Sequence, residues 1–273
     1  LEDGDNKARE IWTEVKKISL SEFDRIYGLL GVKIDNAYAE SFYEDKMQAV
    51  TEEIRKKGLS KKSEGAEIVE FKALPPAMLL KSDGTTTYFT RDLATIKFRI
   101  EEFKPNLIIY EVGSEQSLHF KQVFKTAEML GWLNGTKLVH VAHGLIRLQH
   151  GKMATRYGQT VRLEDILNEA KDRAEKIIKK SKTGRGLSKE EIEDVSEKVG
   201  IGAVKYFDLM HHHSSDIIFD WEKMFVLEGN SAPYLQYTLA RTQSVLRKAQ
   251  SSKLNAQSIK LSAFSLQLNA EEL

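Results

Sequence analysis

Alternation between strand and helix patterns over residues 78–142 constrains the fold of this chain more than any other feature of its sequence. Two stretches, 91–103 and 118–130, have apolar residues at helical spacing. Strands joined by single helices predict a parallel sheet with right-handed crossovers, the doubly wound α/β class. The expected strands are the run at 85–89, which forms a hairpin with the apolar run at 78–80, and the apolar runs at 107–110 and 138–142. Ligands bind such sheets at the carboxyl ends of the strands, which here are residues 88–92, 113–116 and 143–144.

Helical patterns precede this region. Ser19 and Glu22 predict a capping box, and Gly31 ends the helix that follows it. Residues 47–54 form a second helical pattern before Gly58. We expect a polar loop over 56–65 and a hairpin whose second strand is 85–89.

The pattern becomes helical again after residue 161. We expect a long helix over 163–180, a linker over 181–186, and a capping box at Ser188 and Glu191. Further helices follow from about residue 200. A domain boundary is therefore expected near residues 185–200.

Composition excludes several classes of protein. The chain has 273 residues, a formal net charge of +1 and no cysteine. The absence of cysteine excludes disulfides, thiol catalysis, zinc knuckles and iron–sulfur ligation, and it favours a cytoplasmic location. A balanced charge leaves nucleic-acid contact to a local basic face. Since no apolar run approaches the ~18 residues of a membrane span, we expect no membrane association.

Generic site motifs do not account for this sequence. His211, His212 and His213 are consecutive, so on a helix they point in different directions and favour a solvated helix end over a metal site. No metal site is predicted. The glycine-rich phosphate loops and the Gly-x-Ser-x-Gly elbow of hydrolases do not occur.

Five longer strings are more specific. They are TTTYFTRDLA (85–94), VGSEQSLHFKQVF (112–124), HVAHGLI (140–146), GKMATRYG (151–158) and EGNSAPYLQYTLAR (228–241). In this order and spacing they resemble the arginyl-tRNA synthetases, over about residues 1–249. The resemblance implies a class I aminoacyl-tRNA synthetase: an ATP-dependent ligase of protein biosynthesis that forms arginyl-adenylate and transfers arginine to tRNA(Arg).

The family pattern implies an arginine site at Tyr88, Asp92 and Gln116. A guanidinium is a rigid planar fork of donors, so a site that selects it needs a carboxylate, and Asp92 is suitably placed. Taken alone, Asp92 is better interpreted as an ordinary carboxylate in the first turn of a helix, favoured by the dipole. His119 lies in the same string, and capping or packing is as good a reading for it as a family role.

The family's KMSKS loop corresponds to Lys152, Met153 and Arg156. The resemblance implies that Lys152 and Arg156 are catalytic, because mobile cations stabilise charge on the transferring phosphates in the transition state. Ala154 and Tyr157 depart from the usual serine and lysine. A basic hairpin loop is the alternative reading.

ATP, with Mg²⁺, is the implied cosubstrate. The implied ATP-binding residues are His140, Gly144, Lys152 and Met153. His143 occupies a position where the family commonly has an aromatic ring, and no catalytic role is assigned to it.

The last part resembles the start of the family's helical anticodon-binding domain. Arg241, Arg247 and Lys248 are weak candidates for tRNA contact. Tyr234 and Tyr237 could stack on bases, but an aromatic stripe at helical spacing is more typical of core packing. The expected partners are tRNA(Arg), L-arginine and ATP, and the expected state is a monomer.

The sequence lacks the His-x-Gly-His element that this class pairs with its KMSKS loop. We therefore expect an internal or carboxyl-terminal fragment. Residues 1–185 would be the second half of a doubly wound, Rossmann-like nucleotide-binding sheet with the KMSKS-like loop, and residues 186–273 the start of an all-α domain. The alternative hypothesis is a non-catalytic remnant that binds tRNA or a protein.

Overall fold

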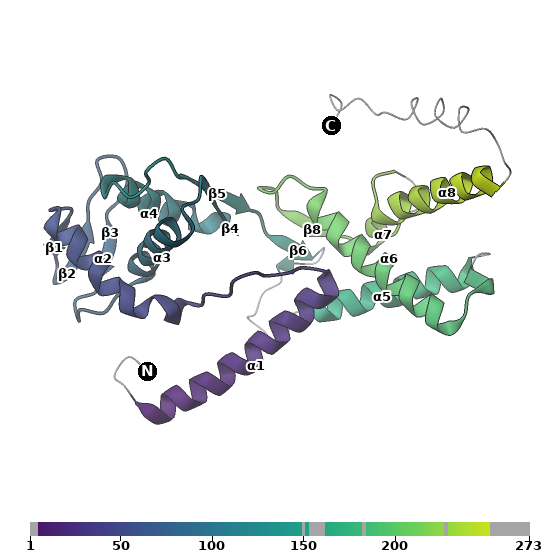
Figure 1. Cartoon of the computed structure of the whole chain (residues 1–273), viewed down its shortest axis with the longest axis horizontal. Helices are drawn as coiled ribbons and strands as arrows, with labels where there is room; N and C mark the ends of the chain where they lie inside the picture. The colour runs from purple at the N-terminus through teal and green to yellow at the C-terminus, as the bar shows by residue number, and fades with distance from the viewer. Residues whose placement is uncertain (1–4, 149–150, 153–161, 182–183, 227–228, 252–273) are drawn as a thin grey trace. The chain divides into compact units, whose positions relative to one another are not determined.

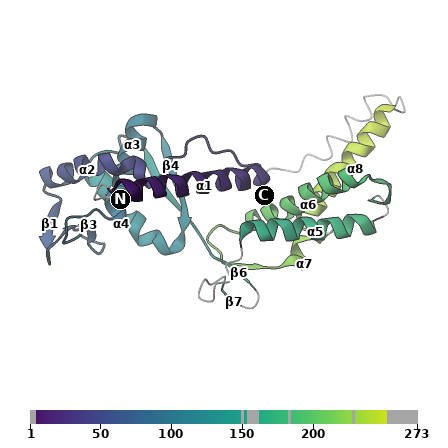
Figure 2. The ribbon, with the colours of Figure 1, turned by 90° about the horizontal axis from the view of Figure 1, so that it is seen from below.

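The computed structural model describes residues 5–148, 151–152, 162–181, 184–226 and 229–251. The chain divides into two compact units. The first comprises Leu1–Lys152 and His211–Phe219, and the second comprises Met153–Met210 and Asp220–Leu273. Figure 1 labels most of their helices and strands, and Figure 2 labels β7.

The first unit contains all the strands of the described residues and four α-helices. Its elements are α1 (Asn6–Leu30), the 3₁₀ helix η1 (Glu40–Tyr43), α2 (Glu44–Lys56), β1 (Ser60–Ser63), β2 (Ala66–Val69), β3 (Ala77–Leu80), α3 (Tyr88–Phe103), β4 (Leu107–Gly113), η2 (Ser114–Gln116), α4 (Ser117–Met129), β5 (Lys137–His143), β6 (Ile146–Leu148), β7 (Gly151–Lys152) and β8 (Ile217–Phe219).

A parallel pair, β4 and β5, forms the centre of this unit. Leu107 lies opposite Lys137 and the register continues to Gly113 opposite His143. The pair is joined by α4, and α3 leads into β4, so the α/β prediction is confirmed. Fully buried apolar side chains from α2, α3 and α4, among them Ile54, Leu93 and Val123, pack in the same core.

The apolar run at 78–80, expected to form a hairpin with 85–89, is arranged differently and forms β3. Among the described residues, β3 pairs antiparallel with β2, in a separate sheet of order β1-β2-β3. Residues 56–65, expected to be a loop, contain β1, because the chain turns at Gly65 with φ +83° and pairs back on itself.

The expected strand at 85–89 is also wrong. Only Thr86 makes a bridge, to Leu80, and α3 already begins at Tyr88. The Thr87 hydroxyl donates to the Met78 carbonyl at 2.7 Å, and the Thr90 hydroxyl donates to the carbonyl of Leu79. These β-branched residues anchor the start of a helix on β3 where their propensity favours a strand.

The first helix differs from its expected start. Asp5 caps α1, with its carboxylate accepting from the amides of Lys7 and Ala8 at 2.9 and 3.1 Å. Ser19 lies inside the helix and its hydroxyl donates to the Val15 carbonyl, so it caps nothing. Gly31 ends α1 as predicted, with φ +63°.

The second unit is helical throughout its described part. It contains α5 (Leu163–Lys180), η4 (Gly184–Gly186), α6 (Lys189–Leu209), α7 (Trp221–Met224) and α8 (Ala232–Ser251). α5 and α6 lie side by side in both views (Figures 1 and 2). Gly200 permits their close approach, because a Cβ there would lie 2.7 Å from the Ala170 carbonyl carbon.

The capping box at the start of α6 is confirmed, since Ser188 and Glu191 exchange both hydrogen bonds. The two compact units do not coincide with the expected domains 1–185 and 186–273, because α5 packs against α6. The expected domains were those of the family that the sequence resembles, and the boundary between them stays a prediction. Within the described residues, no helix is long and apolar enough to cross a membrane.

Candidate functional site

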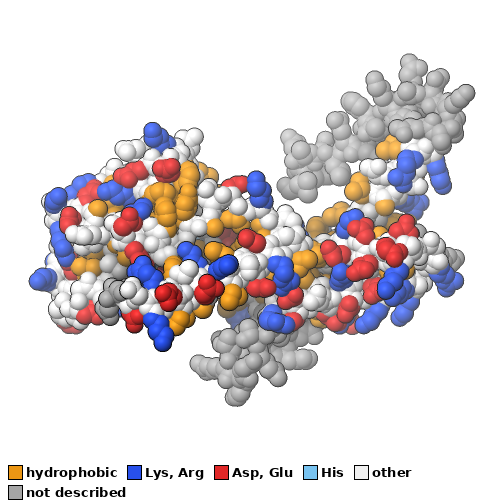
Figure 3. Space-filling view, turned by 60° about the horizontal axis from the view of Figure 1, so that its bottom comes forward, with side chains coloured by type: hydrophobic (Ala, Val, Ile, Leu, Met, Phe, Trp, Pro, Cys, Tyr) orange, Lys and Arg blue, Asp and Glu red, His pale blue; other side chains and the backbone are white. Residues whose placement is uncertain are grey.

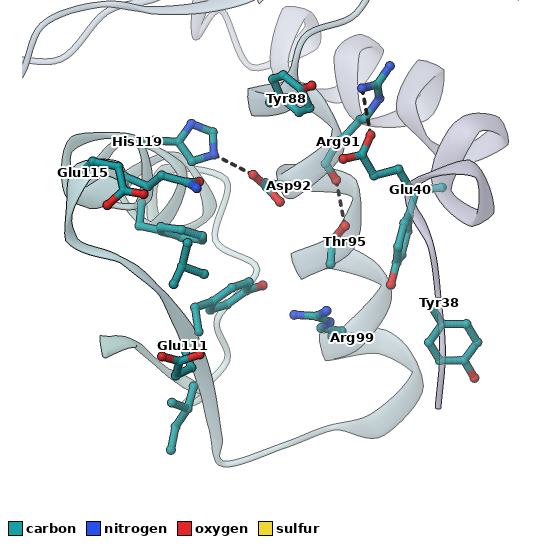
Figure 4. A pocket seen from close by; sticks show the side chains of 16 residues that line it. Tyr38, Glu40, Tyr88, Arg91, Asp92, Thr95, Arg99, Glu111, Glu115 and His119 are labelled. Atoms are coloured by element: carbon teal, nitrogen blue, oxygen red, sulfur yellow. Dashed lines mark hydrogen bonds and ion pairs between the residues drawn. The ribbon is translucent and has the colours of Figure 1, made fainter. Parts of the chain in front are cut away.

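A pocket of about 810 Å³ opens in the first unit beside α3. η1, α3, β4, η2 and α4 contribute its walls. The predicted arginine-site residues Tyr88 and Asp92, both on α3, and Gln116, on η2, all line it. The structure therefore brings these three side chains to one pocket, at the amino-terminal end of α3 and just after the carboxyl end of β4. Figure 4 labels Tyr88 and Asp92 among the lining residues.

Asp92 faces His119 across this pocket. The Nε2 atom of His119 lies 2.6 Å from Oδ2 of Asp92, and Figure 4 shows the two side chains pointing toward one another. Because α3 begins at Tyr88, Asp92 is its fifth residue and lies beyond the first turn. This corrects the placement of Asp92 in a first turn, which rested on a later helix start. The dipole effect fades beyond the first turn and so explains Asp92 poorly.

Arg91 is directed away from Asp92. Its guanidinium lies 3.1 Å from Oε2 of Glu40 and packs over the ring of Tyr88, 5.5 Å from the ring centre. The Tyr88 ring is largely exposed. Arg91 is thus paired with Glu40 and not with Asp92, whose carboxylate lines the pocket.

The charge of the pocket favours a cationic ligand. Its lining includes four carboxylates, on Glu40, Asp92, Glu111 and Glu115, and two guanidinium groups, on Arg91 and Arg99. With histidine neutral, the acidic groups outnumber the basic ones. On the face that Figure 3 shows, positive and negative side chains are interspersed, so the charge bias of this pocket is local.

Two tyrosines and an arginine at the inner end of the pocket were not predicted. Tyr43 and Tyr110 are 3% and 7% exposed, and neither hydroxyl has a hydrogen-bond partner among the described residues. Burial raises the pKa of Tyr110 to about 12, although Arg99, 5.2 Å from its ring centre, acts in the opposite direction. For Arg99, the sequence did contain a signal that could have placed it in this site: it follows Asp92 by seven residues and so lies on the same face of the helix.

The predicted ATP residues His140 and Gly144 lie outside this pocket lining. His140 donates from Nε2 to the Val112 carbonyl at 3.0 Å, and its ring lies 4.7 Å from that of Phe120. The backbone of Ser215 packs directly against Gly144. A Cβ at residue 144 would lie 2.2 Å from the carbonyl oxygen of Ser215. The absence of a side chain at residue 144 is therefore required by packing.

The KMSKS-like segment begins in a small sheet of order β7-β6-β8. Lys152, in β7, lies opposite Arg147 in β6, and β6 runs parallel to β8. The guanidinium of Arg147 lies 2.7 Å from the Asp216 carboxylate. The Leu145 amide and the Arg147 side chain hold the pKa of Asp216 below its ordinary value. Met153 and Arg156, and the departures Ala154 and Tyr157, lie outside the described residues.

The candidate tRNA residues Arg241, Arg247 and Lys248 lie on α8, in the second unit. Arg241 donates to the Tyr237 hydroxyl at 3.1 Å. Tyr234 and Tyr237 are exposed, at 39% and 54%, so the expectation that they pack in a core is wrong.

The consecutive histidines 211–213 lie in the turn that follows α6. The rings of His212 and His213 stack, and His213 donates from Nδ1 to the Ala142 carbonyl at 2.9 Å. Within the described ranges, no group of three or more His, Asp or Glu could hold a metal ion.

The chain was compared with known proteins. The family described as "tRNA synthetases class I (R), catalytic domain" matches residues 1–221. The chain is 43% identical over 249 residues to an arginine–tRNA ligase of Clostridium acetobutylicum, covering 90% of this chain and 44% of that protein. A ligase of the same name from Clostridioides difficile is 42% identical over 249 residues, with 90% and 43% covered.

Two solved structures are similar in fold. The arginyl-tRNA synthetase of Plasmodium falciparum has a TM-score of 0.82 at 26% identity, covering 93% of this chain and 43% of that one. The Thermus thermophilus enzyme has a TM-score of 0.74 at 20% identity, covering 89% and 47%. The chain thus spans less than half the length of each of these four relatives.

Proposed function

Because this chain belongs to the class I (R) tRNA synthetase family, we propose that it carries part of the active site of an arginine–tRNA ligase. The protein of the relatives' full length would use ATP to convert L-arginine to arginyl-adenylate and would transfer arginine to tRNA(Arg). The observation that carries this proposal is that Tyr88, Asp92 and Gln116 line one acidic pocket.

The pocket suits a guanidinium for physical reasons. Asp92 is about two-thirds buried, so an ion pair formed there is screened less than one at the surface. Tyr88 offers an aromatic face and a hydroxyl, and Gln116 offers a neutral acceptor. A neutral side chain of similar shape would leave the Asp92 carboxylate partly desolvated and unpaired, which costs about 1–3 kcal/mol or more.

We assign the ATP site to His140, Gly144, Lys152 and Met153, with Lys152 and Arg156 as the catalytic cations. Cations here would stabilise charge on the phosphates as the arginine carboxylate attacks the α-phosphate. Mg²⁺ would enter with ATP.

We assign tRNA contact to Arg241, Arg247 and Lys248 on the exposed surface of α8. The proposal also includes a monomeric, cytoplasmic protein, with a family domain boundary near residue 185. Because the net charge is only +1, tRNA binding would depend on local basic groups.

Arginine-dependent pyrophosphate exchange by the full-length protein that contains these residues tests this function. We expect Asp92→Ala to raise the KM for arginine by 100-fold or more, about 3 kcal/mol, and to leave the KM for ATP unchanged. Asp165→Ala is the matched control, because Asp165 is an exposed carboxylate in the first turn of α5.

The control variant should leave arginine kinetics unchanged. Unchanged arginine kinetics in Asp92→Ala would remove Asp92 from the site. No exchange by the full-length wild-type protein, either alone or with tRNA(Arg) added, would refute the ligase function and favour a non-catalytic binding protein.

A further inference from the structure

We propose that His119 is the positioning residue for Asp92: its Nε2–H holds Oδ2 of the carboxylate, so that the remaining lone pairs face the arginine guanidinium. The inference deepens the proposed function and rests on it. It concerns a residue for which the sequence left capping, packing and a family role open.

The hydrogen bond itself is the first observation. The separation of 2.6 Å is at the short end for a donor to a carboxylate, as expected of a charge-assisted bond. Within the described part of the chain, His119 is the one hydrogen-bond partner of the Asp92 side chain. Two rotatable bonds connect that carboxylate to the backbone of α3, so His119 is what fixes its direction.

The ring of His119 is itself held in place. Phe89 and Phe120, both 4% exposed, contact it edge-on, with ring centres 6.5 and 5.3 Å away. The donor is therefore oriented before any ligand arrives, and binding does not have to pay the entropy of ordering it. Phe89 is on α3 and Phe120 is on α4, so the two helices set the position of His119 together.

The charge balance of the pair also fits this role. A neutral imidazole that donates Nε2–H leaves the pair with the full negative charge of Asp92, which a guanidinium requires. A lysine or arginine at residue 119 would neutralise that charge and compete with the ligand. Arg91, the nearest cation in sequence, is paired with Glu40 at 3.1 Å.

Three variants of the full-length protein test the proposal in the pyrophosphate exchange assay. We expect His119→Ala to raise the KM for arginine about tenfold or more, with kcat and the KM for ATP unchanged. We expect His119→Gln to recover most of this loss, because its amide nitrogen can reach the place of Nε2. His212→Ala, in the exposed turn after α6, should change nothing.

A double-mutant cycle separates positioning from a general effect. In an Asp92→Ala background, His119→Ala should add little further increase in the KM for arginine, because no carboxylate remains to be held. A thermal unfolding curve for each variant shows whether the first unit still folds.

Two results would overturn the inference and leave the ligase function standing. One is a normal KM for arginine in His119→Ala when Asp92→Ala is defective. The other is a lower kcat together with a higher KM for both arginine and ATP in His119→Ala, with no recovery in His119→Gln. That result would mean that His119 has a packing role. Failure of the wild-type protein to exchange at all would instead refute the proposed function.

Discussion

Glu67, at the level of single residues, shows how this chain holds a charge at the edge of its core. Its side chain, 11% exposed, lies on β2 and accepts from Arg55 at 2.6 Å and from the Ser60 hydroxyl at 2.6 Å. The hydrogen bond from Arg55 is the main reason why the pKa of Glu67 lies below its ordinary value, and burial acts in the opposite direction.

This lowered pKa predicts an acid-labile contribution to stability. A carboxyl whose pKa is lower in the folded state contributes stability above its unfolded pKa, about 4.3, and loses it as the pH falls through the folded value. We expect Glu67→Gln to lower the free energy of unfolding by about 1–2 kcal/mol at pH 7 and to lose that difference below about pH 4.

The measurement is urea unfolding of the whole chain between pH 3 and pH 7. Glu70→Gln is the matched control, because Glu70 follows the same strand and pairs with Lys61 where both side chains are 56% exposed. An exposed pair of this kind contributes little. Equal effects of the two substitutions at pH 7 would contradict the burial argument.

Some residues of the candidate site could be predicted from the sequence and others could not. The family resemblance implied an arginine site at Tyr88, Asp92 and Gln116, which lie in or near the ends of expected strands, and the three residues do line one pocket. Tyr43 and Arg99 line it too but follow no strand end, since η1 reaches the pocket through packing on α2 and α3. No local sequence pattern predicts a contact between elements of this kind.

At the level of elements, the same four-residue pattern behaves differently in two helices. Ser188 and Glu191 form a complete capping box at the start of α6. Ser19 and Glu22 have the same spacing but lie within α1, which Asp5 already caps fourteen residues earlier in the chain. A capping pattern identifies a helix start only if the preceding residues are not helical, and this depends on residues outside the pattern.

This difference gives a paired prediction. Ser188→Ala should destabilise the second unit by about 1 kcal/mol, because the Glu191 amide loses its acceptor. Ser19→Ala should leave stability unchanged or raise it slightly, since alanine has the higher helix propensity.

Amide hydrogen exchange measures both effects. The amide of Glu191 should lose protection in Ser188→Ala, and the amides of α1 should be unaffected in Ser19→Ala. A loss of similar size at both sites would contradict the assignment of α1 as one continuous helix over Asn6–Leu30.

At the level of the whole molecule, the chain contains one side of the proposed active site. It has the pocket beside α3 and the start of the KMSKS-like loop, but its sequence has no His-x-Gly-His string. The alternation of strands and helices predicted the α/β class and the β4–β5 pair, because both depend on neighbours in sequence. It did not predict that β3 joins β2, since strand pairing is decided by packing over long distances.

We therefore predict that the 273-residue chain alone has no arginine-dependent pyrophosphate exchange. Binding groups for the ATP phosphates would be incomplete, and the transition state would lack part of its stabilisation. The assay compares this chain with a protein of the relatives' full length under the same conditions. Robust exchange by these 273 residues would show that the pocket and loop suffice.

The discontinuity of the first unit has a consequence for biosynthesis. β6 is complete at Leu148, but its parallel neighbour β8 ends only at Phe219, after α5 and α6. A ribosome adds ~5–20 residues per second, so β8 is completed roughly 4–14 s after β6. During that time the edge of β6 that pairs with β8 has no partner strand. Asp216, which anchors Arg147, arrives in the same late segment. The base of the KMSKS-like loop is thus among the last parts of the first unit to mature on a nascent chain, and a ribosome stalled between these strands would hold a protein whose arginine pocket is formed and whose loop base is open.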